Sequence, residues 1–151
     1  MPRRQSMPGR WFILDRPPDR KVWAVLRRLP PRSGLMALCY LNPAERRRLR
    51  HIGKLRSLAI AAERPRVAAR VHNIAELRLA LQRRTPMILL SPIFPTRSHP
   101  DWKPVPRMRA ASLARLGGRR LLALGGMTAG RYAKIAPLGF IGWAGISAFR
   151  T

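Results

Sequence analysis

Short apolar runs alternate with amphipathic stretches along this chain. Seven runs stand out, at residues 11–14, 34–41, 57–62, 66–71, 87–91, 121–125 and 140–145. Each is short, and several are apolar throughout, which is typical of parallel strands covered by helices on both faces. The pattern therefore predicts seven strands.

Helical periodicity occupies the stretches between these runs. Between residues 22 and 29, apolar side chains recur at i, i+3, i+4 and i+7, the spacing of one helix face. Asn42 and Asn73 each have a glutamate three residues later, which is the pattern of a helix N-cap. Two further helices are predicted over residues 108–116 and 128–136.

Alternation of strands and helices with short connections predicts an α/β fold with a mainly parallel sheet. A complete (β/α)₈ TIM barrel needs eight strands and typically about 250 residues. This chain has 151 residues and seven predicted strands. We therefore expect one domain over residues 11–151, a TIM-barrel-like but incomplete barrel, preceded by a basic arm at residues 1–10.

The charge balance is strongly positive. Lys and Arg total 31 against 6 Asp and Glu, a formal net charge of +25, and only four of the 31 are lysines. Such a field attracts polyanions, so RNA, DNA, anionic lipid and phosphorylated metabolites are candidate partners. A GC-rich coding sequence could produce the same bias, and no zinc-finger or RNA-binding signature accompanies it. Nucleic-acid binding through non-specific charge stays open.

Several classes of protein are disfavoured by what the sequence lacks. A single cysteine, Cys39, excludes an internal disulfide and a cysteine-rich metal site, and its apolar surroundings favour a buried structural thiol. No apolar run reaches the roughly 18 residues of a membrane span. We expect a cytoplasmic protein without a membrane partner, and the sequence leaves oligomerisation open.

In α/β sheets, ligands bind beyond the carboxyl ends of the strands. The last two predicted strands lead into Gly125–Gly126 and into Gly145, Ile146 and Ser147. Glycines let the backbone approach a ligand closely, and backbone amides suit a phosphate. A Gly-Gly pair alone is often only a tight turn, but two such loops after consecutive final strands favour a phosphate site.

A third carboxyl end carries hydroxyls and cations. Thr96 and Ser98 offer hydrogen-bond donors, and Arg97 and His99 offer positive charge to a phosphate. The alternative is a proline-stiffened loop whose hydroxyls only cap backbone groups. His72 also ends a predicted strand, where a histidine can serve either catalysis or structure.

Carboxylates that could hold a metal ion are scarce. Magnesium in proteins normally takes at least one carboxylate ligand. Only Asp15 and Glu63 follow predicted strands. There is no paired-carboxylate motif, no P-loop and no GxSxG elbow.

Four blocks in the second half of the chain are similar to one enzyme family. They are VHN at 71–73, SPIFPTRSHP at 91–100, ALGGM at 123–127 and GWAGISA at 142–148. In this order they resemble thiamine phosphate synthase and its relative, the thiazole tautomerase. The resemblance implies a barrel enzyme that joins a pyrimidine pyrophosphate to a thiazole phosphate with Mg²⁺, releasing pyrophosphate.

The resemblance also implies roles for individual residues. Catalytic roles fall to His72, Thr96, Ser98 and His99, thiazole-phosphate binding to Gly125, Gly126, Ile146 and Ser147, and pyrophosphate binding to His72, Asn73, Thr96 and Arg97. Glu63 is the one carboxylate at an edge where the family holds magnesium. Ionising a bond to pyrophosphate requires cations and amide donors at the leaving group, which agrees with this set.

The chain departs from the family pattern at the parts that activate pyrophosphate. The edge of the second strand reads Leu38-Cys39-Tyr40 where the family has an arginine, and His99 replaces a lysine. The family's fourth strand, which carries one of its magnesium aspartates, has no counterpart in this chain between residues 62 and 67. The hypotheses are therefore an active synthase, an inactive relative that keeps a phosphate site, a thiazole tautomerase using His99 or His72, and a basic nucleic-acid-binding protein.

Overall fold

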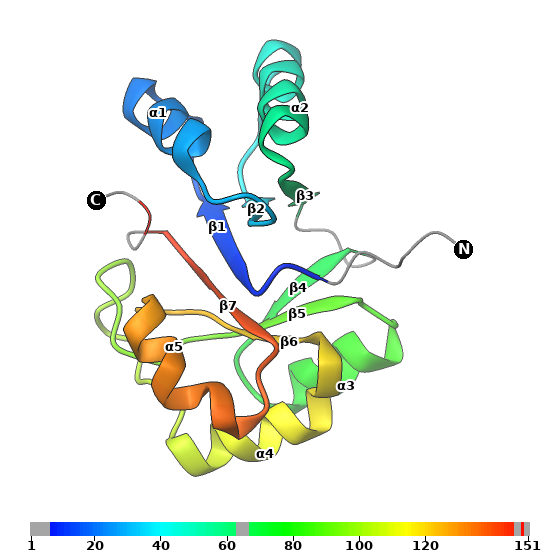
Figure 1. Cartoon of the computed structure of the whole chain (residues 1–151). Helices are drawn as coiled ribbons and strands as arrows, with labels where there is room; N and C mark the ends of the chain where they lie inside the picture. The colour runs from blue at the N-terminus through cyan, green and yellow to red at the C-terminus, as the bar shows by residue number, and fades with distance from the viewer. Residues whose placement is uncertain (1–6, 63–66, 147–148, 150–151) are drawn as a thin grey trace.

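The computed structural model describes residues 7–62, 67–146 and 149, and these form an α/β fold (Figure 1). The strands are β1 (Arg10–Leu14), β2 (Gly34–Ala37), β3 (Ala59–Ala62), β4 (Ala68–Val71), β5 (Met87–Leu90), β6 (Leu121–Ala123) and β7 (Gly142–Gly145). The α-helices are α1 (Arg20–Arg28), α2 (Pro43–Arg56), α3 (Ile74–Gln82), α4 (Arg107–Gly117) and α5 (Ala129–Ile135). All seven predicted strands are confirmed.

The strands form one parallel sheet that curls into a half-barrel. Their order is β3-β2-β1-β7-β6-β5-β4, so the first strand of the chain, β1, pairs with the last strand, β7. Within the described residues β3 and β4 are the two ends of the sheet and do not pair with each other. Only residues 63–67 join them, which is too short for the strand and helix of a βα unit. The predicted incomplete, TIM-barrel-like fold is confirmed.

Alternate residues of a strand face opposite sides of the sheet, and in the strands between the two edges both sides are buried. Met87 and Leu89 of β5 join the cluster on the concave side, whereas Ile88 and Leu90 join a cluster beneath the helices. Helices α1 and α2 pack over β1 and β2, and α3, α4 and α5 pack over the other half (Figure 1). Burial on both sides explains why the strands read as continuous apolar runs.

Local signals set where the helices begin. Asn42 caps α2 in a complete capping box, with its Oδ1 accepting from the Glu45 N–H at 2.8 Å. Asp19 caps α1 and Thr128 caps α5. The predicted caps at Asn42 and Asn73 are confirmed.

Strand ends depend on the neighbouring strand. The run at 34–41 forms a strand only over Gly34–Ala37, because β1 ends at Leu14 and the last hydrogen bond there is from Leu38 N–H to the Leu14 carbonyl. Residues 7–9, which the sequence assigned to the basic arm, contact the fold: Gly9 accepts a hydrogen bond from Trp143 N–H, and Pro8 one from Trp11 Nε1. Residues 1–6 of that arm lie outside the described residues.

Candidate functional site

Two loops that follow neighbouring strands are hydrogen-bonded together at the carboxyl-end edge of the sheet. We call them the β5 loop (residues 91–106) and the β6 loop (residues 124–128). Ile93 N–H donates to the Leu124 carbonyl at 2.9 Å, and Phe94 N–H donates to the Gly125 carbonyl at 3.1 Å. The structure thus brings together two segments that the sequence marked separately.

The two glycines of the β6 loop are required by this close approach. Gly125 and Gly126 have φ angles of +98° and +59°, in the region that favours glycine. A Cβ on Gly125 would lie 2.7 Å from Pro92 Cα, and one on Gly126 would overlap the Pro95 carbonyl oxygen. Both the backbone conformation and the packing therefore exclude larger residues.

An arginine that no sequence motif marked contacts both loops where Gly125 and Gly126 meet the β5 loop; we call this place the Gly125–Gly126 corner. Arg131, in the first turn of α5, donates from Nη1 to the Gly126 carbonyl at 2.6 Å. Its guanidinium carbon lies 5.2 Å from the centroid of the Phe94 ring, within cation–π range. In a chain so rich in arginine, nothing in the local sequence distinguished this one.

The hydroxyls of the β5 loop have a local role. Thr96 Oγ1 accepts a hydrogen bond from the Ser98 backbone N–H at 3.3 Å, and Thr96 is only partly exposed. Arg97, Ser98 and His99 are exposed. Accepting that bond leaves the Thr96 hydroxyl hydrogen, like that of Ser98, available to a ligand oxygen.

Trp102 packs between two of the predicted site histidines. Its ring is stacked on His99, with centroids 4.0 Å apart and planes 10° apart, and meets the His72 ring edge-on at 5.0 Å. The contact connects the β5 loop to the carboxyl end of β4. No sequence motif pointed to Trp102, although it is the only Trp, Phe or Tyr between Thr96 and Val105.

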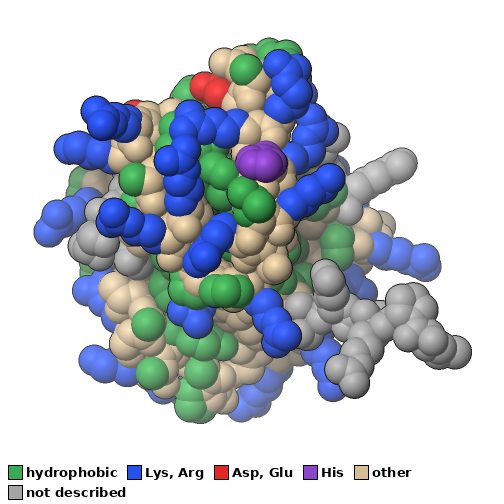
Figure 2. Space-filling model, turned by 45° about the horizontal axis from the view of Figure 1, so that its top comes forward, with side chains coloured by type: hydrophobic (Ala, Val, Ile, Leu, Met, Phe, Trp, Pro, Cys, Tyr) green, Lys and Arg blue, Asp and Glu red, His purple; other side chains and the backbone are tan. Residues whose placement is uncertain are grey.

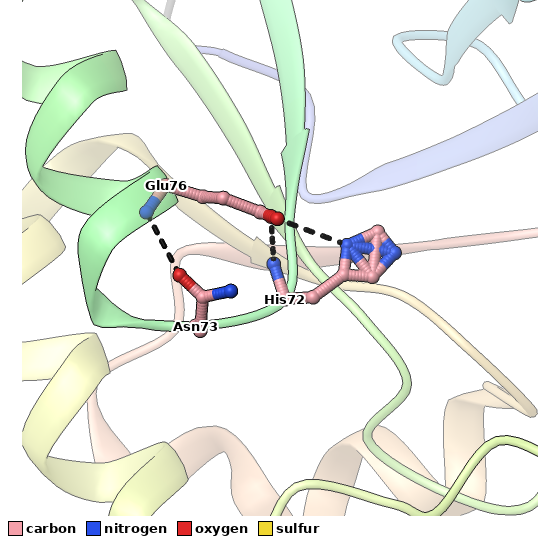
Figure 3. Close-up of polar contacts among 3 residues, drawn as sticks. All are labelled: His72, Asn73 and Glu76. Carbon is pink, nitrogen blue, oxygen red and sulfur yellow. Dashed lines mark hydrogen bonds and ion pairs between the residues drawn. The ribbon is translucent and has the colours of Figure 1, made fainter.

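Polar contacts at the end of β4 join His72, Asn73 and Glu76 (Figure 3). Glu76 Oε2 accepts the His72 backbone N–H at 2.7 Å and lies 3.4 Å from His72 Nδ1. Asn73 Oδ1 caps α3 by accepting the Glu76 N–H at 2.9 Å. The Glu76 carboxylate therefore positions His72 at the edge of the sheet.

The edge of β7 leads toward an aromatic contact. Ile146 is partly buried against the concave cluster, and Ser147 lies outside the described residues. Phe149 stacks on Trp143 at 5.1 Å and meets Phe12 edge-on at 5.6 Å. This contact ties the end of the chain to the first strand.

The comparisons with known proteins agree with this arrangement. A family model described as thiamine monophosphate synthase matches residues 51–149, from α2 to the aromatic contact after β7. The match spans about two thirds of the chain. The chain belongs to the thiamine monophosphate synthase family.

A solved structure shows the same fold. Thiamine phosphate pyrophosphorylase from Pyrococcus furiosus superposes with a TM-score of 0.75 at 14% identity, over 97% of this chain and 89% of that one. No curated protein matches the sequence. The half-barrel is therefore a variant of the fold of this family.

The described residues do not fit a magnesium centre. They contain no group of three or more His, Cys, Asp or Glu side chains that could hold a metal ion. Asp19, Glu45 and Glu76, three of their five carboxylates, accept hydrogen bonds from helix N-termini. Glu63, the predicted metal ligand, lies outside the described residues.

Cys39, which follows β2, and the lengths of the helices bear on two other functions. Burial raises the pKa of the Cys39 thiol, which keeps it protonated near neutral pH and unsuited to nucleophilic attack. No helix in the described part of the chain is long and apolar enough to span a membrane.

Proposed function

We propose that this protein binds a thiazole phosphate where the β6 loop meets the end of β7, and joins it to a pyrimidine pyrophosphate to give thiamine phosphate and pyrophosphate. Membership of the thiamine monophosphate synthase family supports the reaction class. The Gly125–Gly126 corner supports the position of the phosphate.

The observation that carries this proposal is a pair of free backbone donors. Among the described residues, neither the Gly125 N–H nor the Gly126 N–H has a hydrogen-bond acceptor, while both carbonyls are occupied, by Phe94 N–H and Arg131. Both residues are partly exposed. Two successive amides held rigidly at a strand end suit phosphate oxygens, and Arg131 adds positive charge beside them. Ile146 and Ser147 complete this set in the proposal.

The proposed pyrophosphate site uses the β4 and β5 ends. His72, Asn73, Thr96 and Arg97 contribute donors and charge toward the leaving group, and Ser98 and His99 lie beside them. Charge develops on the pyrophosphate oxygens as the bond to the pyrimidine breaks, so fixed donors there lower the barrier. Trp102 packs against both His72 and His99 and so connects the two histidines.

Binding of the thiazole phosphate is tested by calorimetry on three proteins. Gly126→Ala displaces the corner and is expected to weaken binding at least tenfold. Gly130→Ala is the matched control, because Gly130 lies in α5 and a Cβ there would meet Thr128 Oγ1 at 4.0 Å, an ordinary van der Waals distance. Arg131→Gln, which leaves the glycines intact, provides a second measurement if Gly126→Ala fails to fold. Unchanged affinity in both variants would contradict the site.

Turnover is tested by incubating the protein with both substrates and Mg²⁺ and measuring thiamine phosphate. Thr96→Val is expected to lower the rate at least tenfold, since it removes the hydroxyl and keeps the shape. The absence of a carboxylate cluster among the described residues favours a second candidate, a relative that binds the phosphate ligand without turnover. Binding without product would select that candidate, and neither binding nor product would refute both.

A further inference from the structure

A basic groove lies between the two N-terminal helices. We call it the α1–α2 groove, and its cavity volume is about 250 Å³. It is lined by Arg27, Arg48, His51, Ile52, Leu55 and Arg56. Because α1 and α2 run antiparallel to the strands they follow, their C-terminal halves, which form the groove, point away from the carboxyl-end edge of the sheet.

Two guanidinium groups of the groove are held in place by the fold. The Arg48 guanidinium carbon lies 4.3 Å from the centroid of the Trp23 ring. Arg56 donates from Nη2 to the Leu29 carbonyl at 2.9 Å, while its Nε has no acceptor within the described structure. Fixed guanidiniums lose little entropy when an anion binds.

Among the described residues, no carboxylate lines the groove to neutralise it. Asp19 and Glu45, the acidic residues at the starts of α1 and α2, both accept helix N–H groups in caps. Further exposed cations continue along the helices: Arg28, Arg46, Arg47, Arg50 and Lys54. Figure 2 turns this end of the molecule forward and shows Lys and Arg side chains over the whole face, with few acidic ones.

We propose that the α1–α2 groove binds the phosphate backbone of a nucleic acid. The cations extend beyond the cavity along α2, whose 14 residues span about 21 Å. A strand of duplex DNA carries about six phosphates over that length. An anion with one phosphate would engage only part of this surface.

A bilayer fits the same surface less well. A helix that lies in a membrane interface presents a broad apolar face. On α1 and α2, Leu55 is the only large hydrophobic side chain that is well exposed in the described structure. Three of the six residues that line the groove are arginines, whose planar guanidiniums match phosphate oxygens two at a time.

The test measures fluorescence anisotropy with a labelled 20-nucleotide single-stranded RNA and with a duplex DNA of the same sequence. The double variant R27Q/R48Q removes two groove cations. R115Q/R119Q removes the same charge from the exposed side of α4 and its 3₁₀ extension, in the other half of the molecule. We expect at least tenfold weaker binding for the first pair and less than a twofold change for the second.

Salt dependence gives an independent readout. For RNA, losing two phosphate contacts should reduce the slope of log K against log salt concentration by about 1.4. The single variant Arg27→Gln leaves the Arg48–Trp23 contact intact, and it replaces R27Q/R48Q, with half the expected change in slope, if that variant unfolds. The stronger of the two probes identifies whether RNA or DNA is the ligand.

Three outcomes would overturn the proposal. Equal weakening by the groove and control pairs would mean that binding is spread over the whole charge. Loss of binding to phosphatidylglycerol vesicles in R27Q/R48Q, with nucleic-acid binding unchanged, would assign the groove to lipid. The absence of binding to either probe at 10 μM protein and 0.1 M salt would also refute it.

Discussion

At the scale of the residue, Gly126 determines the form of the candidate site. Its φ of +59° is costly for any residue with a Cβ, and the Pro95 carbonyl occupies the space a Cβ would need. The Gly126 N–H, which has no acceptor among the described residues, is oriented by this conformation. Gly126, which pointed to the candidate site in the sequence, therefore cannot be replaced by a larger residue without strain.

We expect Gly126→Ala to lower the free energy of unfolding by about 1–2 kcal/mol through its left-handed backbone alone, with a further loss from the clash. Gly130→Ala should be neutral or stabilising by up to about 1 kcal/mol, because alanine favours a helix. Urea unfolding followed by circular dichroism measures both. Equal stability of the two variants would show that the β5 and β6 loops separate without cost.

At the scale of the element, the two asparagine caps have the same chemistry in different places. Asn42 begins α2 and Asn73 begins α3, and each side chain accepts the N–H of a glutamate three residues on. Only Asn73 lies beside His72 at the carboxyl end of β4. Comparing variants of Asn42 and Asn73 therefore distinguishes the effect of losing a helix cap from the effect of losing a ligand-binding residue.

Asn42→Ala and Asn73→Ala should each lower the free energy of unfolding by about 1 kcal/mol, the usual value of a helix cap. Only Asn73→Ala should also weaken binding of inorganic pyrophosphate, measured by calorimetry. If pyrophosphate affinity is the same in both variants, Asn73 is a cap and nothing more.

Elements were predicted well because their signals are local. The caps at Asn42 and Asn73 and the apolar run at 87–91 depend on neighbours in sequence, and the structure confirms them. The run at 34–41 was predicted too long, because the end of β2 is set by where β1 stops offering hydrogen-bond partners. Arg131 and Trp102 were missed for the same reason: their partners come from other loops.

At the scale of the whole molecule, a net charge of +25 is carried by a half-barrel of 151 residues. Self-repulsion of that size opposes the compact state. With 31 Lys and Arg against 6 Asp and Glu, there are too few carboxylates to neutralise most of the cations. The strength of this repulsion between exposed cations therefore depends on the salt concentration of the solvent.

Raising NaCl from 0.1 M to 1 M shortens the screening length from about 10 Å to about 3 Å. We expect Tm to rise by at least about 3 °C, which is the shift that about 1 kcal/mol gives in a domain of this size. KCl should act alike, because screening depends on charge and concentration. A constant or falling Tm would show that the repulsion costs the native state little.

The sequence by itself determined the strands, the asparagine caps, the parallel sheet and the Gly-Gly turn after β6, because periodicity, capping and glycine requirements act within a few residues. Only the tertiary structure decided that β3 and β4 end an open half-barrel, that Arg131 and Pro95 enclose Gly126, and that Trp102 joins His72 to His99. It also decided which of the many arginines lie together: Arg27, Arg48 and Arg56 line the groove between α1 and α2. These features arise from contacts between segments far apart in the chain, and a contact of that kind leaves no periodic mark on either segment.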